Sequence, residues 1–187
     1  MKAFTMKLYK RSILALAICA LTACGGSGSS ATNTPPGTPP VVASPTPTTL
    51  YGPLITAEIA LIGKDDNGNG IRDDVESWIT TNFKDAPTQN AAKTRAQWLT
   101  WVMLRGSRNL PVTESDANAV AAASACWYET AYLTLGPAMP SANEWEALLF
   151  NTHARAVAYL TWDANSDGIV RKIGVTPCKD VIAVSPL

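Results

Sequence analysis

The stretch TQNAAKTRAQWLTWVML, residues 88–104, decides the fold class of this chain. Its small and apolar side chains recur every three or four residues, which is the spacing of one helix face. The residues on this face are Ala91, Ala92, Ala96, Trp98, Leu99, Val102 and Met103. Pro87 precedes the pattern and Gly106 follows it, which predicts a helix from about Thr88 to about Leu104.

Three other segments have the same helical spacing. Val75, Trp78, Ile79 and Phe83 share one face of a first helix. Thr113, with Asp116 three residues later, is expected to cap a helix that runs to about Leu135. Its expected face comprises Val120, Ala121, Ser124, Trp127, Tyr128 and Ala131. Ser141 and Glu144 form a capping box, in which each side chain answers the other's backbone N–H. The helix that follows is expected to bury Trp145, Leu148, Leu149, Thr152, Ala156, Tyr159 and Leu160.

No run of alternating polar and apolar residues predicts a strand. The sequence therefore predicts an all-α domain over residues 54–187, a small antiparallel bundle of three to four helices preceded by a calcium-type loop. The tail, residues 173–187, is expected to be mostly irregular. All six tryptophans fall in this domain and are expected in its core; a partly exposed cluster would instead form a binding surface.

The first 23 residues have the organisation of an export signal. Residues 1–11 are basic, and residues 12–20 form an apolar run too short to span a bilayer. The sequence Leu21-Thr22-Ala23-Cys24 that follows resembles the lipobox of bacterial lipoproteins. The resemblance implies cleavage before Cys24, lipid on the thiol of Cys24, and anchoring in the bacterial cell envelope. Gly25, in place of Asp, resembles outer-membrane sorting. The alternative is ordinary cleavage at Ala23.

Residues 24–53 are rich in Gly, Ser, Thr and Pro, and they contain seven of the 13 prolines. Such a segment cannot bury enough apolar surface to offset the entropy of ordering it. The sequence therefore predicts a disordered tether between the lipid and the helical domain.

Two cysteines, Cys126 and Cys178, lie in the body of the chain. Because the envelope outside the cytoplasm is oxidising, we expect them to form a disulfide. Its loop of about 50 residues would be worth about 4 kcal/mol in the chain-entropy model. The alternative is two buried free thiols.

Residues 65–76, DDNGNGIRDDVE, contain the most specific chemical motif of the chain. Oxygen-bearing side chains stand where an EF-hand loop places its ligands, and Gly70 stands at the sharp turn. The stretch resembles EF-hand and dockerin-type loops, and also uncharacterised secreted proteins of proteobacteria. The resemblance implies Ca²⁺ ligands at Asp65, Asn67, Asn69, Ile71 (through its carbonyl), Asp73 and Glu76.

The motif departs from the EF-hand pattern at one position. Paired loops carry an apolar residue at position 8, where this chain has Arg72, so a solitary loop is expected. With three carboxylates and two neutral amides we expect the modest affinity of extracellular modules. The alternative is a metal-free, Asx-rich turn that caps a helix.

A second stretch, DANSDGI at residues 163–169, repeats part of the motif. Asp163, Asn165 and Asp167 match the first three ligand positions. Arg171 and Gly174 stand where the last two acidic ligands would be, so this segment is the weaker metal candidate. A plain polar turn is the alternative.

Several functions are excluded or lack support. The four basic residues of the signal segment leave 11 basic against 15 acidic residues, which gives no electrostatic reason to bind nucleic acid. His153 is the only histidine, and no serine nucleophile elbow, phosphate loop or zinc motif is present. We therefore expect a lipid-anchored envelope protein with a structural calcium loop and no evident catalytic site. The alternatives are an interaction or inhibitor subunit that uses exposed aromatics, and a hydrolase of envelope polymers with two convergent carboxylates.

Overall fold

The computed structural model describes residues 48–172, 174, 178, 181–184, 186 and 187. These residues belong to one compact unit. The expected signal peptide, the lipidation site Cys24 and the tether up to residue 47 lie outside the described residues. Within the described part of the chain, no helix combines the length and the apolar character needed to cross a membrane.

Helices dominate the described residues. The elements in chain order are β1 (Thr48–Thr49), β2 (Gly52–Pro53), α1 (Thr56–Ile62), α2 (Asp73–Asn82), α3 (Ala86–Ser107), α4 (Glu114–Leu135), the 3-10 turn η1 (Gly136–Ala138), α5 (Ala142–Leu149) and α6 (His153–Asn165). The two short strands pair antiparallel, with Thr49 opposite Gly52. The all-α prediction is confirmed, with this small β-hairpin in addition.

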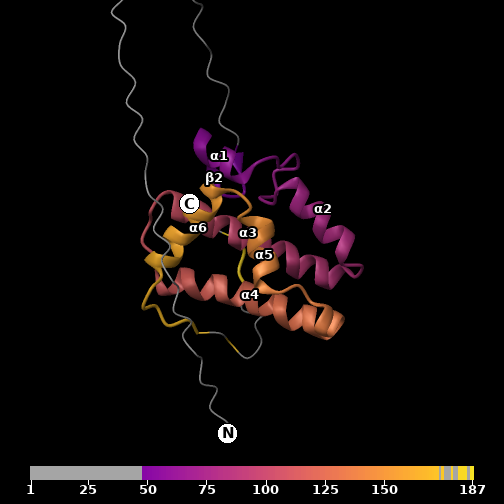
Figure 1. The fold of residues 1–187 in the computed structure, drawn as a ribbon. Coiled ribbons are helices and arrows are strands. Elements are labelled where there is room, and N and C mark those ends of the chain that lie inside the picture. The colour runs from indigo at the N-terminus through magenta and orange to yellow at the C-terminus, as the bar shows by residue number, and fades with distance from the viewer. Residues whose placement is uncertain (1–47, 173, 175–177, 179–180, 185) are drawn as a thin grey trace, which may run out of the picture. The chain divides into compact units, whose positions relative to one another are not determined.

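Helix α3 lies at the centre of the unit and contacts α1, α2, α4, α5 and α6 (Figure 1). The predicted stop at Gly106 is wrong, because α3 continues through it to Ser107. A Cβ at Gly106 would lie 1.9 Å from the carbonyl oxygen of Ala158 in α6. Gly106 therefore allows the close crossing of α3 and α6.

The prediction of one continuous helix after Ser141 is wrong. The chain forms two helices there, α5 and α6, which are separated by a break at residues 150–152. Thr152 starts the second of these helices, with its hydroxyl accepting the N–H of Arg155 at 3.3 Å. Thr152, as the N-cap of α6, lies on the surface. Leu160, further along α6, is 50% exposed. Both residues had been expected in the core. The N-cap at Thr113 and the capping box at Ser141 are confirmed, and Thr113 also forms a capping box with Asp116.

Two hydrophobic clusters form the core. The first gathers the expected face of α2 around Trp127 and Trp145, and the second contains Trp98, Trp101 and Trp162. These five tryptophans are at most 3% exposed, and Trp78 is half-buried against the first cluster. Core packing of the tryptophans is therefore confirmed, and they do not form an exposed aromatic surface.

The folded unit begins earlier than residue 54. Tyr51, expected in the tether, is fully buried in the second cluster. The C-terminal end reaches the same place, since the N–H of Leu187 donates to the carbonyl of Tyr51 at 3.0 Å. A disulfide joins Cys126 in α4 to Cys178, which is the predicted pairing.

Candidate metal centre

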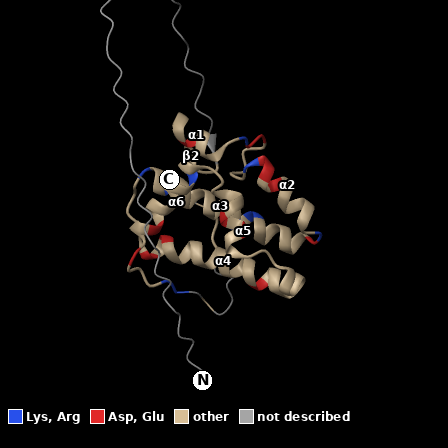
Figure 2. Ribbon diagram, in the orientation of Figure 1, with Lys and Arg blue, Asp and Glu red and all other residues tan. Residues whose placement is uncertain are grey.

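The calcium-type loop connects α1 to α2. Helix α1 enters the loop and has only seven residues, and α2 begins at Asp73. Asp73, Asp74 and Glu76 occupy the first turn of α2, where the helix dipole favours acids. Acidic ribbon segments accordingly gather at the loop and the start of α2 (Figure 2).

Asp65 folds the loop back on itself. One carboxylate oxygen accepts the N–H of Asn69 at 3.2 Å, and the other accepts the N–H of Gly70 at 2.8 Å. Gly70 has a φ of +81°, the left-handed conformation that favours glycine. The sharp turn predicted at this glycine is therefore present.

The predicted ligand Glu76 faces two other predicted ligands across the loop. Its carboxylate accepts the side-chain amides of Asn67 at 2.8 Å and Asn69 at 2.7 Å. Lys93 of α3 lies 3.5 Å from the same carboxylate. The oxygen of each amide accepts a backbone N–H, from Asn69 at 3.0 Å and from Ile71 at 2.8 Å. To present these oxygens to a cation beside Glu76, each amide has to rotate and give up that hydrogen bond. The structure thus brings together the polar groups of Asn67, Asn69 and Glu76, beside the turn that Asp65 holds.

Asp73, the expected ligand at position 9, is directed elsewhere. Its carboxylate accepts the N–H of Asp66 at 3.0 Å and pairs with the ammonium of Lys64 at 2.8 Å. The hydrogen bond from Lys64 holds the pKa of Asp73 below its usual value, so the group is ionised at neutral pH. In the described part of the chain, no three His, Cys, Asp or Glu side chains are grouped closely enough to hold a metal. Calcium binding therefore stays a prediction that depends on the asparagine amides.

Ile71, the expected ligand at position 7, fixes the loop through its side chain and through its backbone N–H. Its side chain is 1% exposed and packs in the first hydrophobic cluster. That packing leaves the main chain of Ile71 in the loop, where a carbonyl ligand is expected. Its N–H donates to the side-chain oxygen of Asn69 at 2.8 Å.

Two residues that the sequence did not single out fix the loop to α3. The hydroxyl of Tyr51 donates to the carbonyl oxygen of Gly70 at 2.7 Å and lies 3.0 Å from that of Gln97. The side-chain amide of Gln97 donates to the carbonyl of Asn69 at 2.9 Å. Burial raises the pKa of Tyr51, so its phenol keeps its proton. One sequence signal was present, because Leu50 and Tyr51 are large apolar residues at the end of the Pro/Thr-rich segment.

Arg72 explains why position 8 carries a charge. Its guanidinium donates to the carbonyls of Leu148 at 2.8 Å and Leu149 at 3.3 Å, which are the last carbonyls of α5. Arg155 does the same for α1, since its Nε donates to the carbonyl of Leu61 at 2.7 Å. The loop therefore packs against a helix end within this unit.

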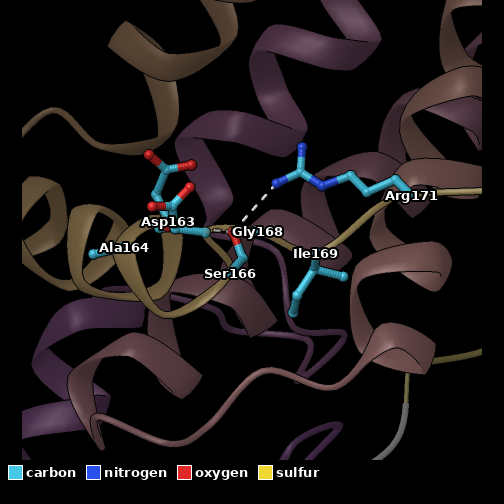
Figure 3. Close-up of a pocket in the computed structure, with 7 residues that line it drawn as sticks. Asp163, Ala164, Ser166, Gly168, Ile169 and Arg171 are labelled. Carbon is cyan, nitrogen blue, oxygen red and sulfur yellow. Dashed lines mark hydrogen bonds between the residues drawn. The ribbon is translucent and has the colours of Figure 1, made fainter.

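The weaker candidate, at residues 163–169, is arranged differently, because Asp163 and Asn165 belong to the last turn of α6 and the chain turns only after Asn165. The amide of Asn165 donates to Asn109 at 3.1 Å and to the carbonyl of Leu110 at 3.2 Å, away from the turn. Arg171 extends toward the turn and donates to the hydroxyl of Ser166 at 3.3 Å (Figure 3). The arrangement brings a cation, and not a third carboxylate, to Asp163 and Asp167.

Two other titratable residues, His153 and Glu144, lie at the starts of helices α6 and α5. His153 is exposed at the start of α6. Glu144 accepts the N–H of Ser141 at 2.7 Å in its capping box, and this bond lowers the pKa of Glu144. Comparison with protein-family models, with curated proteins and with solved structures found no match.

Proposed function

We propose that this chain is a lipid-anchored protein of the bacterial cell envelope whose loop at residues 65–76 binds Ca²⁺ as a structural element. One observation carries the calcium part: Asp65 closes the turn while Asn67 and Asn69 both face Glu76. Hard Ca²⁺ takes carboxylate, amide and main-chain oxygens at this spacing. The lipid part is supported by the lipobox sequence that ends at Cys24 and by the disulfide, which suits an oxidising compartment.

A structural role fits the loop better than a sensing role. Tyr51, Gln97 and Arg72 tie the loop to α3 and α5. A calcium-driven opening of α1 and α2 would have to break these hydrogen bonds. With a modest affinity, the site would be filled constitutively where calcium is plentiful.

The alternatives receive no specific support. The interaction hypothesis relied on exposed aromatics, and five of the six tryptophans are buried. The hydrolase hypothesis needs two carboxylates in a cleft that admits a polymer. Glu146 and Asp163 line a cavity of about 110 Å³, which is too small for a polymer chain. Asp163 and Asp167 line a larger, open pocket of about 490 Å³, where both carboxylates are exposed to solvent beside Arg171.

Thermal melts of the purified full chain in CaCl₂ and in EGTA test the metal. At a calcium concentration of 100 times Kd, binding adds about 2.7 kcal/mol to stability, which corresponds to roughly 5–10 °C in Tm. Glu76→Gln should remove most of this difference, whereas Glu129→Gln on the exposed face of α4 should keep it. An equal Tm in CaCl₂ and EGTA would overturn the proposed calcium site.

Lipidation is tested separately in cells that express the full chain with a labelled fatty acid. The label should enter the wild-type protein and Cys19→Ser, but not Cys24→Ser. Mass spectrometry should place the new N-terminus at Cys24. An unlabelled protein, or one cleaved elsewhere, contradicts the anchor without affecting the calcium experiment.

A further inference from the structure

Arg95, in the middle of α3, is a buried cation that forms no ion pair with a described carboxylate, although the charge of Glu146 favours its ionised form from farther away. Its side chain is 6% exposed, and its guanidinium lies over the rings of Tyr128 at 4.6 Å and Trp145 at 5.4 Å. Neither Nε nor Nη1 has a hydrogen-bond acceptor among the described residues, and no described carboxylate lies within ion-pair distance. Burial lowers the pKa of Arg95, but a guanidinium keeps its charge in proteins.

A cavity of about 110 Å³ adjoins this guanidinium, between residues of α3, α4, α5 and α6. Its buried walls are apolar and comprise Leu99, Val102, Val120 and Trp162. Because Nε and Nη1 are enclosed by protein, Nη2 is the guanidinium nitrogen that can face the cavity. The space suffices for several waters or one small molecule, whereas drug-sized ligands occupy about 300 Å³ or more.

The acceptors that line the cavity are the hydroxyls of Ser124 and Tyr159 and the carboxylates of Glu146 and Asp163. None of them bonds to Nε or Nη1 of Arg95. The indole N–H of Trp162 is also buried without an acceptor among the described residues. Buried donors of this kind are ordinarily hydrogen-bonded, and an unpaired buried charge is costly. A bound group with a negative charge and hydrogen-bond acceptors would offset the charge of Arg95 at the buried end of the cavity.

The outer end of the cavity limits which anion fits. Glu146, Asp163 and Arg171 line it too, but all three are exposed to solvent. The two carboxylates there repel a dianion more strongly than a monoanion, and Arg171 attracts both. The apolar walls disfavour a strongly hydrated ion. A single negative charge on a short apolar chain meets both conditions.

We propose that this cavity binds a small monocarboxylate, with the carboxylate at Arg95 and the short apolar chain against Leu99 and Val102. The cation–π contacts of Tyr128 and Trp145 hold the guanidinium in place for this role. The proposal is independent of calcium and of the lipid anchor.

Titration of the purified full chain with sodium propionate, against sodium chloride at equal ionic strength, tests the proposal. Tryptophan fluorescence is the readout, because Trp162 lines the cavity and Trp145 lies over Arg95. We expect saturable binding of propionate at millimolar concentration and no saturation with chloride. Equal responses to both salts would overturn the proposal.

Variants then locate the binding site. Arg95→Met should weaken propionate binding at least tenfold, and Arg171→Gln, on the exposed outer end, should weaken it two- to fivefold. Lys84→Gln, an equal change of charge on an exposed residue between α2 and α3, should leave binding unchanged. If Arg95→Met does not fold, the propionate affinity of Arg171→Gln tests the site instead. Unchanged binding in the folded Arg95 variant, or failing that in the Arg171 variant, would overturn the site.

Discussion

The motifs at residues 65–76 and 163–169 begin with the same Asp-x-Asn spacing, but the first lies in a loop and the second begins in the last turn of α6. In the first, the amides of Asn67 and Asn69 face Glu76 across the turn. In the second, the amide of Asn165 faces Asn109 and Leu110, and the end of the motif has no acid. The Asp-x-Asn spacing therefore forms a turn in the first motif and ends a helix in the second. The last acidic residue and the contacts of each segment decide whether its polar side chains converge.

The equivalent glycines provide the most disruptive test of this comparison. Gly70 and Gly168 both have positive φ, of 81° and 78°. A Cβ on Gly70 would lie 2.7 Å from the hydroxyl of Tyr51, whereas a Cβ on Gly168 meets nothing within 4 Å. We expect Gly70→Ala to lower the free energy of unfolding by about 3 kcal/mol, from strain and overpacking together. Gly168→Ala should cost about 1 kcal/mol, from strain alone.

Denaturant unfolding of both alanine variants measures the two costs. Equal losses would mean that the first loop is no more firmly held than the second.

Helix α1, which enters the first loop, is held by a buried ion pair whose contribution to stability depends on pH. Glu58 in α1 is 2% exposed and pairs with Arg108, whose Nη2 lies 3.0 Å from its carboxylate. The hydrogen bond from Arg108 lowers the pKa of Glu58 in the folded state. The stabilisation is therefore present above the unfolded-state pKa, near 4.5, and is lost as pH falls through the lower folded-state value.

Glu58→Gln should cost about 2 kcal/mol at pH 7, because Arg108 keeps a weaker partner. It should also flatten the loss of stability below about pH 5. Urea unfolding between pH 3 and 7 checks both effects, with Glu129→Gln as the exposed control. A pH profile identical to the wild type would show that this pair does not anchor α1.

Tyr51 supplies a smaller effect that is specific to the first loop. Tyr51→Phe removes the hydroxyl that bonds the carbonyl of Gly70 and should cost about 1 kcal/mol. Calcium affinity should fall a few-fold, because the loop is less firmly held. Tyr132→Phe, on a side chain that is 66% exposed, should change neither quantity. Calorimetry of calcium binding and denaturant unfolding give the two readouts, and an unchanged affinity would separate Tyr51 from the metal site.

For the last prediction, acids added to the second motif, we expect no gain of calcium binding. Arg171→Asp with Gly174→Glu supplies acids at the two positions that the second motif lacks. We expect no calcium binding at 1 mM by calorimetry, since the amide of Asn165 stays bonded to Asn109 and Leu110. Binding at that concentration would mean that ligand identity alone distinguishes the two motifs.

Sequence reasoning succeeded where the controlling interaction is local. The N-cap at Thr113 and the capping box at Ser141 each join residues three apart, and the turn at Gly70 depends on Asp65, five residues earlier. These features follow from side chains and backbone within one helical turn or one loop, so the pattern contains the information.

It failed where the controlling contact is distant in sequence. Gly106 has the local character of a helix stop, but its role is set by Ala158 of α6. The break at Thr152 and the burial of Tyr51 likewise depend on packing against other helices. In the loop, Arg72 bonds a carbonyl 76 residues away, which no pattern at residues 65–76 can indicate.

The meeting of Leu187 with Tyr51 has a consequence for the connectivity of the fold. The N–H of Leu187 donates to the carbonyl of Tyr51, so the two ends of the helical unit are adjacent. A short peptide bridging those ends, combined with a new opening in the exposed turn at residues 136–138, would give a circularly permuted chain with the same packing. The order in which the helices are joined is thus separable from the way they pack around α3.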